Sequence, residues 1–140
     1  MTKELLLTME GTRGHVARAI SQAMVFLESH ALPPRSLYQV NLALEEILTN
    51  IVRHGCQEGT TNEIHVRVEL KSAEVIIECV DDCCEFNPLD AAPPDFDSPL
   101  LECEPGGLGI HLVKEATSSM EYCRDQGRNV LRVRVDVPTE

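Results

Sequence analysis

The sequence predicts a two-layer α/β sandwich, an α+β fold in which three helices cover one face of a mixed, mostly antiparallel sheet. Two observations carry this prediction. Apolar and polar residues alternate at 64–71 and at 129–137, as they do in half-buried strands, and each of these stretches neighbours a further expected strand. Three other stretches carry apolar residues at helical spacing. With a length of 140 residues, the order strand, two helices, two strands, loop, helix and two strands predicts one domain.

The first half of the chain supplies one strand and two helices. Residues 4–9 are apolar enough for a strand, and Thr12 is the predicted N-cap of a helix over about 13–30. The proline pair at 33–34 ends that helix and begins the next, because proline is tolerated in a first helical turn. The second helix runs to about His54, where a glycine follows. Its predicted core-facing stripe comprises Leu37, Val40, Leu44, Ile47, Leu48 and Ile51.

The second half supplies two hairpins and a third helix. Residues 64–71 alternate clearly, and a short turn joins them to a second strand at 74–80, so an antiparallel hairpin is expected. A glycine run opens a helix over about 106–117, and two final strands occupy 120–124 and 129–137. The residues of the third helix that we expect to face inward are Leu108, Leu112 and Val113.

A long segment from Asp81 to Pro105 differs in composition from the rest of the chain. It holds five prolines, eight acidic residues and no lysine or arginine. Neither a helix nor a strand suits this composition, and loops of such length in compact domains are usually functional or disordered. A flexible acidic linker is the simplest alternative, but a helix and two strands follow within the same small domain. We therefore predict an acidic lid or docking loop at about 83–105.

Composition excludes several classes of function. The formal net charge of −11 would repel a phosphate backbone, so direct contact with nucleic acid is not expected; a basic protein patch or a metal-complexed nucleotide suits such a surface better. No segment approaches the roughly 20 apolar residues of a membrane span, and the run at 5–7 is too short for a signal peptide. The six cysteines show neither a disulfide framework nor zinc-ligand spacing. We expect a cytoplasmic domain without membrane contact.

Three polar residues lie along one edge of the second helix's apolar stripe. Glu46, Asn50 and His54 are spaced i, i+4 and i+8, so an acid, an amide and an imidazole line one seam. Such a row suits the wall of a half-buried pocket, and an ordinary solvated edge is the alternative. The neighbouring Glu45 lies about 100° further round the helix and is not expected to share the pocket.

Two other features could bind a ligand. The run Gly106-Gly107-Leu108-Gly109 opens a helix, and its backbone N–H groups could hold a phosphate, although it is neither a P-loop nor a dinucleotide fingerprint. Asp81 ends an otherwise apolar strand, where a carboxylate can accept a hydrogen bond from an amine such as that of adenine. A turn-forming aspartate is the commoner alternative.

The order of these features resembles a known superfamily. A helix with Glu-x-x-x-Asn-x-x-x-His, a strand ending in Asp, a long loop and Gly-Gly-Leu-Gly opening a helix are similar to the Bergerat-fold (GHKL) ATPases. The likeness is greatest to the anti-sigma-factor serine/threonine-protein kinases of bacterial partner-switching systems and covers nearly the whole chain. It implies a single histidine-kinase-like ATPase domain that uses ATP and Mg²⁺ in transcription regulation. The implied partners are an anti-anti-sigma-like protein and a sigma factor, and a homodimer is left open.

The resemblance also implies roles for individual residues. Glu46 is similar to the general base that takes the proton from the partner's serine hydroxyl. Asn50 is similar to the Mg²⁺ ligand, which also contacts the nucleotide, and His54 completes the motif as a support. Asp81 is similar to the aspartate that reads adenine. The residues that would form the phosphate-facing turn are Gly107, Leu108 and Gly109.

The chain departs from the family pattern just after the adenine aspartate. The family usually has a glycine two positions on, where this chain has Cys83, although Phe86 and Pro88 of the pattern are present. A side chain there hinders the close backbone approach that glycine permits. The acidic loop also has no cation to offer a triphosphate. A degenerate, non-catalytic module that sequesters its partner is therefore an alternative function, and a redox sensor using Cys83 and Cys84 is a third.

Overall fold

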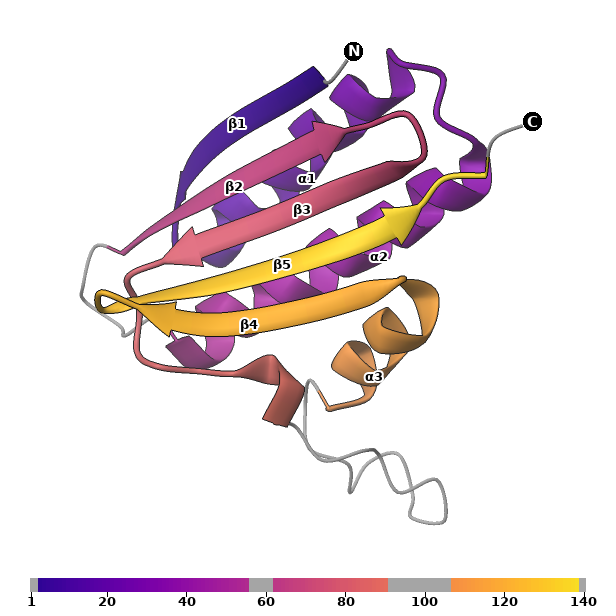
Figure 1. The fold of residues 1–140 in the computed structure, drawn as a ribbon. Coiled ribbons are helices and arrows are strands. Elements are labelled where there is room, and N and C mark those ends of the chain that lie inside the picture. Colours follow the sequence, from indigo (N-terminus) through magenta and orange to yellow (C-terminus); the bar gives the residue numbers. More distant parts are fainter. Residues whose placement is uncertain (1–2, 56–61, 91–106, 139–140) are drawn as a thin grey trace.

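The computed structural model describes residues 3–55, 62–90 and 107–138, and within them five strands form one sheet with three α-helices on one face (Figure 1). The strands are β1 (Lys3–Glu10), β2 (Glu63–Leu70), β3 (Glu74–Asp81), β4 (Ser119–Asp125) and β5 (Arg128–Asp136). The helices are α1 (Arg13–Glu28), α2 (Pro34–Asn50) and α3 (Gly107–Ala116), with a π-turn at Ile51–Gly55 and a 3-10 turn at Pro88–Asp90. None of the described helices is long and apolar enough to cross a membrane.

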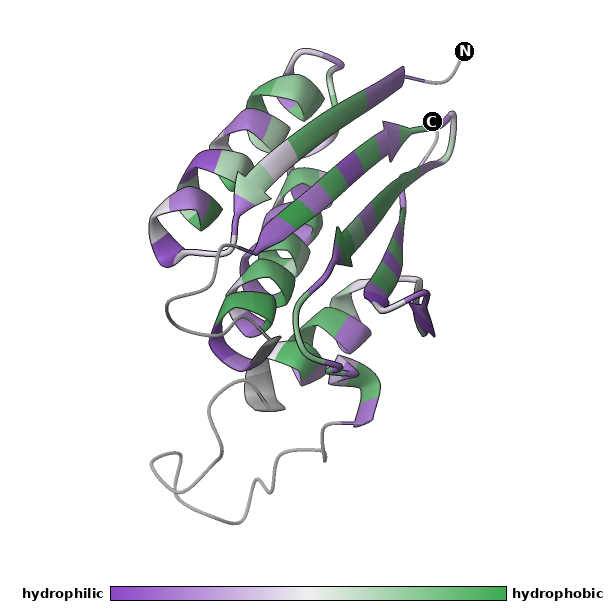
Figure 2. Cartoon of the chain, turned by 90° about the vertical axis from the view of Figure 1, so that its left-hand side faces the viewer, coloured by the Kyte–Doolittle hydropathy of each residue, from purple (hydrophilic) through white to green (hydrophobic). Residues whose placement is uncertain are grey.

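The sheet has the strand order β1-β2-β3-β5-β4. The predicted two-layer sandwich is confirmed, and the view along the layers shows the helices on one side of the sheet (Figure 2). Each neighbouring pair of described strands is antiparallel, so the predicted mixed sheet contains no parallel pair in this part of the chain. Because β5 enters between β3 and β4, the end of β3 lies beside the start of β5, with Asp81 directly opposite Asn129.

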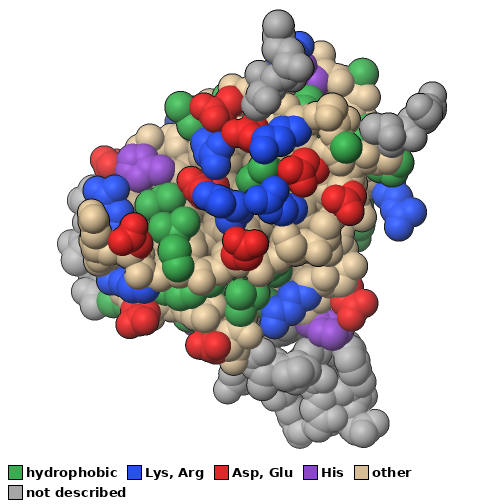
Figure 3. Space-filling model, in the orientation of Figure 1, with side chains coloured by type: hydrophobic (Ala, Val, Ile, Leu, Met, Phe, Trp, Pro, Cys, Tyr) green, Lys and Arg blue, Asp and Glu red, His purple; other side chains and the backbone are tan. Residues whose placement is uncertain are grey.

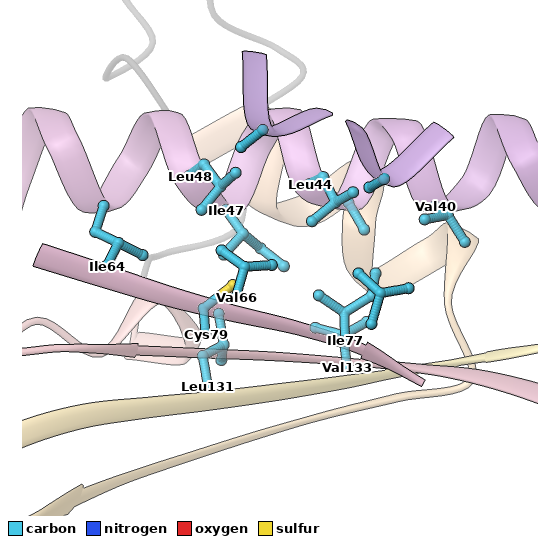
Figure 4. Close-up of a cluster of buried hydrophobic side chains, with 14 of the residues drawn as sticks. Val40, Leu44, Ile47, Leu48, Ile64, Val66, Ile77, Cys79, Leu131 and Val133 are labelled. Carbon is cyan, nitrogen blue, oxygen red and sulfur yellow. The ribbon is translucent and has the colours of Figure 1, made fainter. Parts of the chain in front are cut away.

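The core lies between the sheet and the apolar stripe of α2. Five of the six predicted stripe residues are buried, and Leu37 is partly buried against the same cluster. Side chains of β2 and β5 alternate as predicted, with most apolar residues inward and the charged residues outward. Figure 4 shows the α2 residues over side chains of β2, β3 and β5. Burying each aliphatic side chain contributes about 1.5–3 kcal/mol, so this contact fixes α2 on the sheet.

Both ends of α1 differ in detail from the prediction. Thr12 stands at the N-cap as expected, but its hydroxyl makes no capping hydrogen bond and instead lies 2.6 Å from Nδ1 of His15. The helix ends at Glu28 rather than at about residue 30. Ala31 follows in the left-handed region with φ of 57°, which turns the chain toward α2.

The predicted inward face of α3 is wrong at Leu112, which is 44% exposed. Among the side chains of this helix that the structure describes, Ile110 and Val113 are buried. Two helical positions correspond to about 200°, so Leu112 faces away from Ile110, whereas Val113 lies three positions on and shares its face. The structure describes no side chain for Leu108, so that part of the prediction is open.

The predicted acidic loop falls only partly within the described residues. From the end of β3 the chain continues without regular structure to the 3-10 turn at Pro88–Asp90. The rest of the predicted lid, from residue 91 on, and Gly106 of the glycine run lie outside the described residues.

Candidate functional site

The polar row on α2 spans three environments. Glu46 is half-buried, Asn50 is buried with 3% of its surface exposed, and His54 is exposed. The helix changes to π geometry directly after Asn50, so that the turn carrying His54 closes with i→i+5 spacing. The extra residue per turn rotates His54 relative to its place on a continuous α-helix. Its ring stacks on Phe86, with centroids 4.9 Å apart and planes at 21°.

Glu46 meets the first turn of α3 through Gly109. A Cβ atom at Gly109 would overlap Oε2 and the carboxyl carbon of Glu46, so the carboxylate can lie this close to α3 only because residue 109 is glycine. The helix opened by the predicted glycine run therefore begins against the acid of the polar row. Gly107 is the first residue of α3.

The surroundings of Glu46 raise its pKa above the ordinary value. Burial is the largest cause, and the negative charge of Glu45 acts in the same direction. The positive charge of Arg53 on the π-turn opposes both. Glu45 is exposed on α2, yet its charge reaches Glu46. A carboxylate with a raised pKa binds a proton more readily, which suits a general base.

One pocket brings Asn50 together with Asp81. Asp81 ends β3 and is buried, with 2% of its surface exposed. The side chains that line the pocket come from α2 and its π-turn, the end of β3, the segment after it, β4 and β5: Ile47, Asn50, Ile51, Asp81, Phe86, Pro88, Tyr122, Asn129 and Leu131. Glu46, His54 and Gly109 are not among these lining residues. The structure thus places the predicted residues in two neighbouring groups, joined by α2.

Asp81 is held by one hydrogen bond from a near neighbour in the chain and one from a distant strand. Its Oδ1 accepts from the backbone N–H of Cys83 at 3.0 Å and from Nδ2 of Asn129 at 2.9 Å. Sequence reasoning missed Asn129. Its signal was a polar residue in the inward register of β5, where the residues two, four and six positions on are apolar and buried.

Cys83 does not line the pocket, although it replaces the family's glycine. Its side chain is buried in the hydrophobic core cluster. Its φ is not positive, because among described residues other than glycine only Ala31 and Gln126 have positive φ. The backbone here needs no left-handed conformation, so a cysteine is accommodated without strain.

The buried thiol of Cys79 does not favour thiol chemistry. Burial, with smaller contributions from Asp81 and Glu78, raises the pKa of this thiol to about 12. It therefore stays protonated and unreactive at neutral pH.

The amide of Asn50 fits a ligand that offers hydrogen-bond acceptors, such as the phosphate oxygens of a nucleotide. Its Nδ2 is buried without a hydrogen-bond partner among the described residues, and leaving a buried polar group unmatched costs about 1–3 kcal/mol. No group of three or more His, Cys, Asp or Glu in the described ranges could hold a metal ion alone. Mg²⁺ bound with a nucleotide takes most of its ligands from phosphates and water, with one or two from protein. The donor set therefore fits a nucleotide-bound ion better than an independent metal site.

A comparison with known protein families shows to which family this chain belongs. The histidine kinase-like ATPase domain family matches residues 9–135. The chain belongs to this family. The resemblance to the Bergerat-fold (GHKL) ATPases is thereby confirmed, and the residues that form the pocket and the polar row all lie within the matched range.

One curated protein and one solved structure are similar to this chain. The serine/threonine-protein kinase BtrW of Bordetella bronchiseptica is 29% identical over 119 residues, which are 82% of this chain and 84% of BtrW. The crystal structure of the RsbU and RsbW domains of Rv1364c from Mycobacterium tuberculosis matches 99% of this chain with a TM-score of 0.65 and 12% identity. This chain spans 33% of that larger chain, and the match shows a shared fold.

Proposed function

We propose that this ATPase domain is an ATP-dependent serine/threonine-protein kinase that phosphorylates a small anti-anti-sigma-like protein. The observation that carries the proposal is one pocket that contains both the buried carboxylate of Asp81 and the amide of Asn50, whose Nδ2 has no hydrogen-bond partner among the described residues. The contact between Glu46 and Gly109 lies beside it. Similarity to BtrW, which is named a serine/threonine-protein kinase, over most of both chains supports the activity.

The pocket residues would bind and orient the nucleotide. Bound ATP and Mg²⁺ would supply the transferable phosphoryl group and neutralise charge during its transfer. Asp81 would accept a hydrogen bond from the adenine amine, and Asn50 would offer its amide oxygen to the ion. The start of α3 would direct backbone N–H groups and the positive end of the helix dipole toward the phosphates. The residues of that turn in the proposal are Gly107, Leu108 and Gly109.

Glu46 would act as the general base. It would take the proton from the partner's serine hydroxyl as the serine oxygen attacks the terminal phosphoryl group, and its raised pKa favours accepting that proton. His54 would support the row without taking part in the chemistry, because its ring stacks on the pocket residue Phe86. Positioning and charge neutralisation supply most of the catalysis in such a transfer.

The same proposal covers the cellular setting. Residues 1–140 would act as one domain in the cytoplasm, with the acidic segment at about 83–105 as a lid near the nucleotide. The domain would regulate transcription by binding its protein partner, and also a sigma factor, without direct contact with nucleic acid or membrane. Size measurements of the purified chain would decide between a monomer and a homodimer.

Calorimetry and a phosphotransfer assay test the proposal together. The wild-type chain should bind Mg-ATP at millimolar nucleotide or below and transfer phosphate to a purified anti-anti-sigma-like protein. Asp81→Asn should weaken nucleotide binding. Glu46→Gln should bind nucleotide but lose transfer, because its amide cannot accept the proton. Absence of Mg-ATP binding by the folded wild-type chain would contradict the proposal.

A non-catalytic module that sequesters its partner is the second candidate. The feature that favours it is the acidic segment 81–105, which has eight acids and no lysine or arginine to offer a triphosphate. Binding of the partner without phosphate transfer, and with equal affinity for the wild-type chain and Glu46→Gln, would support this alternative. Transfer that disappears in Glu46→Gln would exclude it.

A further inference from the structure

The irregular segment between β3 and the 3-10 turn is held by side chains. Outside helices and strands, backbone polar groups need other partners. The carbonyl of Cys83 accepts a hydrogen bond from Nη1 of Arg124 at 3.0 Å. The carbonyl of Cys84 accepts one from Nδ2 of Asn129 at 2.9 Å. Both donors come from the β4–β5 hairpin, which therefore fixes the path of the segment beside the pocket.

Asn129 is the centre of these contacts, and it is buried. Its Nδ2 donates to Asp81 and to Cys84, as described above. Its Oδ1 accepts from three donors: the hydroxyl of Tyr122, Nη1 of Arg124 and the backbone N–H of Phe86. A side-chain amide has two N–H donors and two acceptor lone pairs, so every hydrogen-bonding group of Asn129 is in use. Although it lines the pocket, it acts through other residues rather than on a ligand.

We propose that Asn129 and Arg124, together called the hairpin latch, position the nucleotide pocket. The latch holds one oxygen of Asp81 and the backbone from Cys83 to Phe86, so that the carboxylate and the Phe86 ring take fixed places in the pocket wall. In this chain it secures a segment in which a cysteine stands where the family usually has glycine. The inference rests on the proposed function and assigns positioning residues that the sequence did not reveal.

A charge-matched pair of variants tests the exposed half of the latch. Arg124→Ala removes the hydrogen bonds to Cys83 and to Asn129, whereas Arg128→Ala removes the same charge from the same hairpin. The side chain of Arg128 makes no hydrogen bond or ion pair within the described part of the chain. Arg124→Ala should weaken Mg-ATP binding about tenfold and speed hydrogen exchange at the Phe86 amide, as expected for a lost charge-assisted bond. Arg128→Ala should change neither.

A second pair tests the buried half. Asn129→Asp removes both Nδ2 donors and places a carboxylate beside Asp81, so it should weaken Mg-ATP binding more than Arg124→Ala does. Val133→Ala, on the same strand, lowers stability through the core and lies outside the pocket. Dissociation constants are measured at a temperature at which both variants are folded. Asn129→Asp should lose affinity out of proportion to its stability, and Val133→Ala should not.

The outcomes separate this inference from the function on which it rests. A folded wild-type chain that does not bind Mg-ATP would contradict the proposed function. Wild-type binding that Arg124→Ala and Asn129→Asp leave unchanged contradicts the latch alone. Loss of affinity that simply follows loss of stability in all four variants also contradicts the latch, because a purely structural role predicts that result.

Discussion

Gly109 is the residue of α3 that lies against the Glu46 carboxylate. Its replacement should lower phosphotransfer activity while leaving the free energy of unfolding nearly unchanged. In Gly109→Ala the new methyl group would displace the Glu46 carboxylate, which is the mobile end of a side chain and can swing away. Alanine also favours the helix by up to about 1 kcal/mol, so the free energy of unfolding should change by less than about 1 kcal/mol. Phosphotransfer should nevertheless fall at least about tenfold, because the displaced carboxylate would no longer lie where it can accept the serine proton.

Gly14→Ala is the matched control for this prediction. It makes the same change in the first turn of α1, where an added Cβ would meet no atom within 4 Å. Urea titration should show unchanged or slightly higher stability, and activity should equal that of the wild-type chain. Full activity in Gly109→Ala would show that the Glu46 carboxylate does not need its observed position.

The pKa of Glu46 gives a second prediction at the residue scale. Glu45→Gln removes a charge that raises this pKa, and Arg53→Ala removes one that lowers it. If the ionised carboxylate is the base, the acidic limb of the kcat/KM profile should move to lower pH in Glu45→Gln and to higher pH in Arg53→Ala. Movement of the limb in the same direction in both variants would assign it to another group. Both exposed side chains can be changed without disturbing the core.

Residues of the candidate site could be predicted from sequence only where the neighbouring residues in the chain indicate how buried a position is. Helical spacing alone placed Asn50 at the border of the stripe, and the apolar strand before Asp81 indicated its burial. Asn129 was missed because one polar residue at the start of a strand is also typical of a turn. Its hydrogen bonds reach residues more than 40 positions away in the chain, and local patterns carry no information on such contacts.

At the scale of elements, the turn after α1 offers a test of backbone conformation. Ala31 has φ of 57°, a region that costs a residue with a Cβ about 1–2 kcal/mol. Ala31→Gly removes this strain but adds chain entropy to the unfolded state, which costs about 0.5–1 kcal/mol. The net expectation is a gain of about 0.5–1 kcal/mol in the free energy of unfolding by urea titration, since the left-handed position after a helix favours glycine.

Ala17→Gly, in the exposed middle of α1, is the opposite control. The same substitution there should lower the free energy of unfolding by about 1 kcal/mol, because the helical conformation suits alanine and not glycine. Equal effects of the two changes would mean that Ala31 is not held in the left-handed conformation in solution.

Elements with a large apolar partner were predicted best. The stripe of α2 and the alternation of β5 are read directly from sequence because each packs against a continuous core. The short α3 was predicted less well. Leu112 and Val113 are adjacent and both apolar, and only the packed structure shows which of them turns inward. The π-turn after Asn50 also has no local signal in the residues that form it.

At the scale of the whole molecule, the net charge is −11, but on one face of the sheet acidic side chains are paired with basic ones. The face of the sheet opposite the helices carries interspersed acidic and basic side chains (Figure 3). Glu78, on the central strand β3, lies between two of the cations: its Oε2 accepts from Nε and Nη2 of Arg132 at 3.1 and 2.6 Å and lies 3.5 Å from Nη2 of Arg67. These contacts tie β2, β3 and β5 together across strands.

Glu78→Gln tests whether this network stabilises the fold. Burial by itself would raise the pKa of Glu78, but the hydrogen bonds from Arg132 and the charge of Arg67 outweigh it and hold the pKa below its ordinary value of 4.5. The stabilisation is therefore present above pH 4.5 and is lost as pH falls through the lowered pKa. At pH 7 the substitution should lower the free energy of unfolding by about 1–2 kcal/mol.

This difference between wild type and Glu78→Gln should shrink as pH falls below 4.5, measured by urea titration over a pH series. Glu121→Gln is the control, since Glu121 also faces Arg132 across the sheet but makes no ion pair within the described strands. Its effect at pH 7 should stay within about 0.5 kcal/mol, as for most exposed charges. A difference for Glu78→Gln that persists unchanged at low pH would show that the side chain stabilises the sheet by packing and not by its charge.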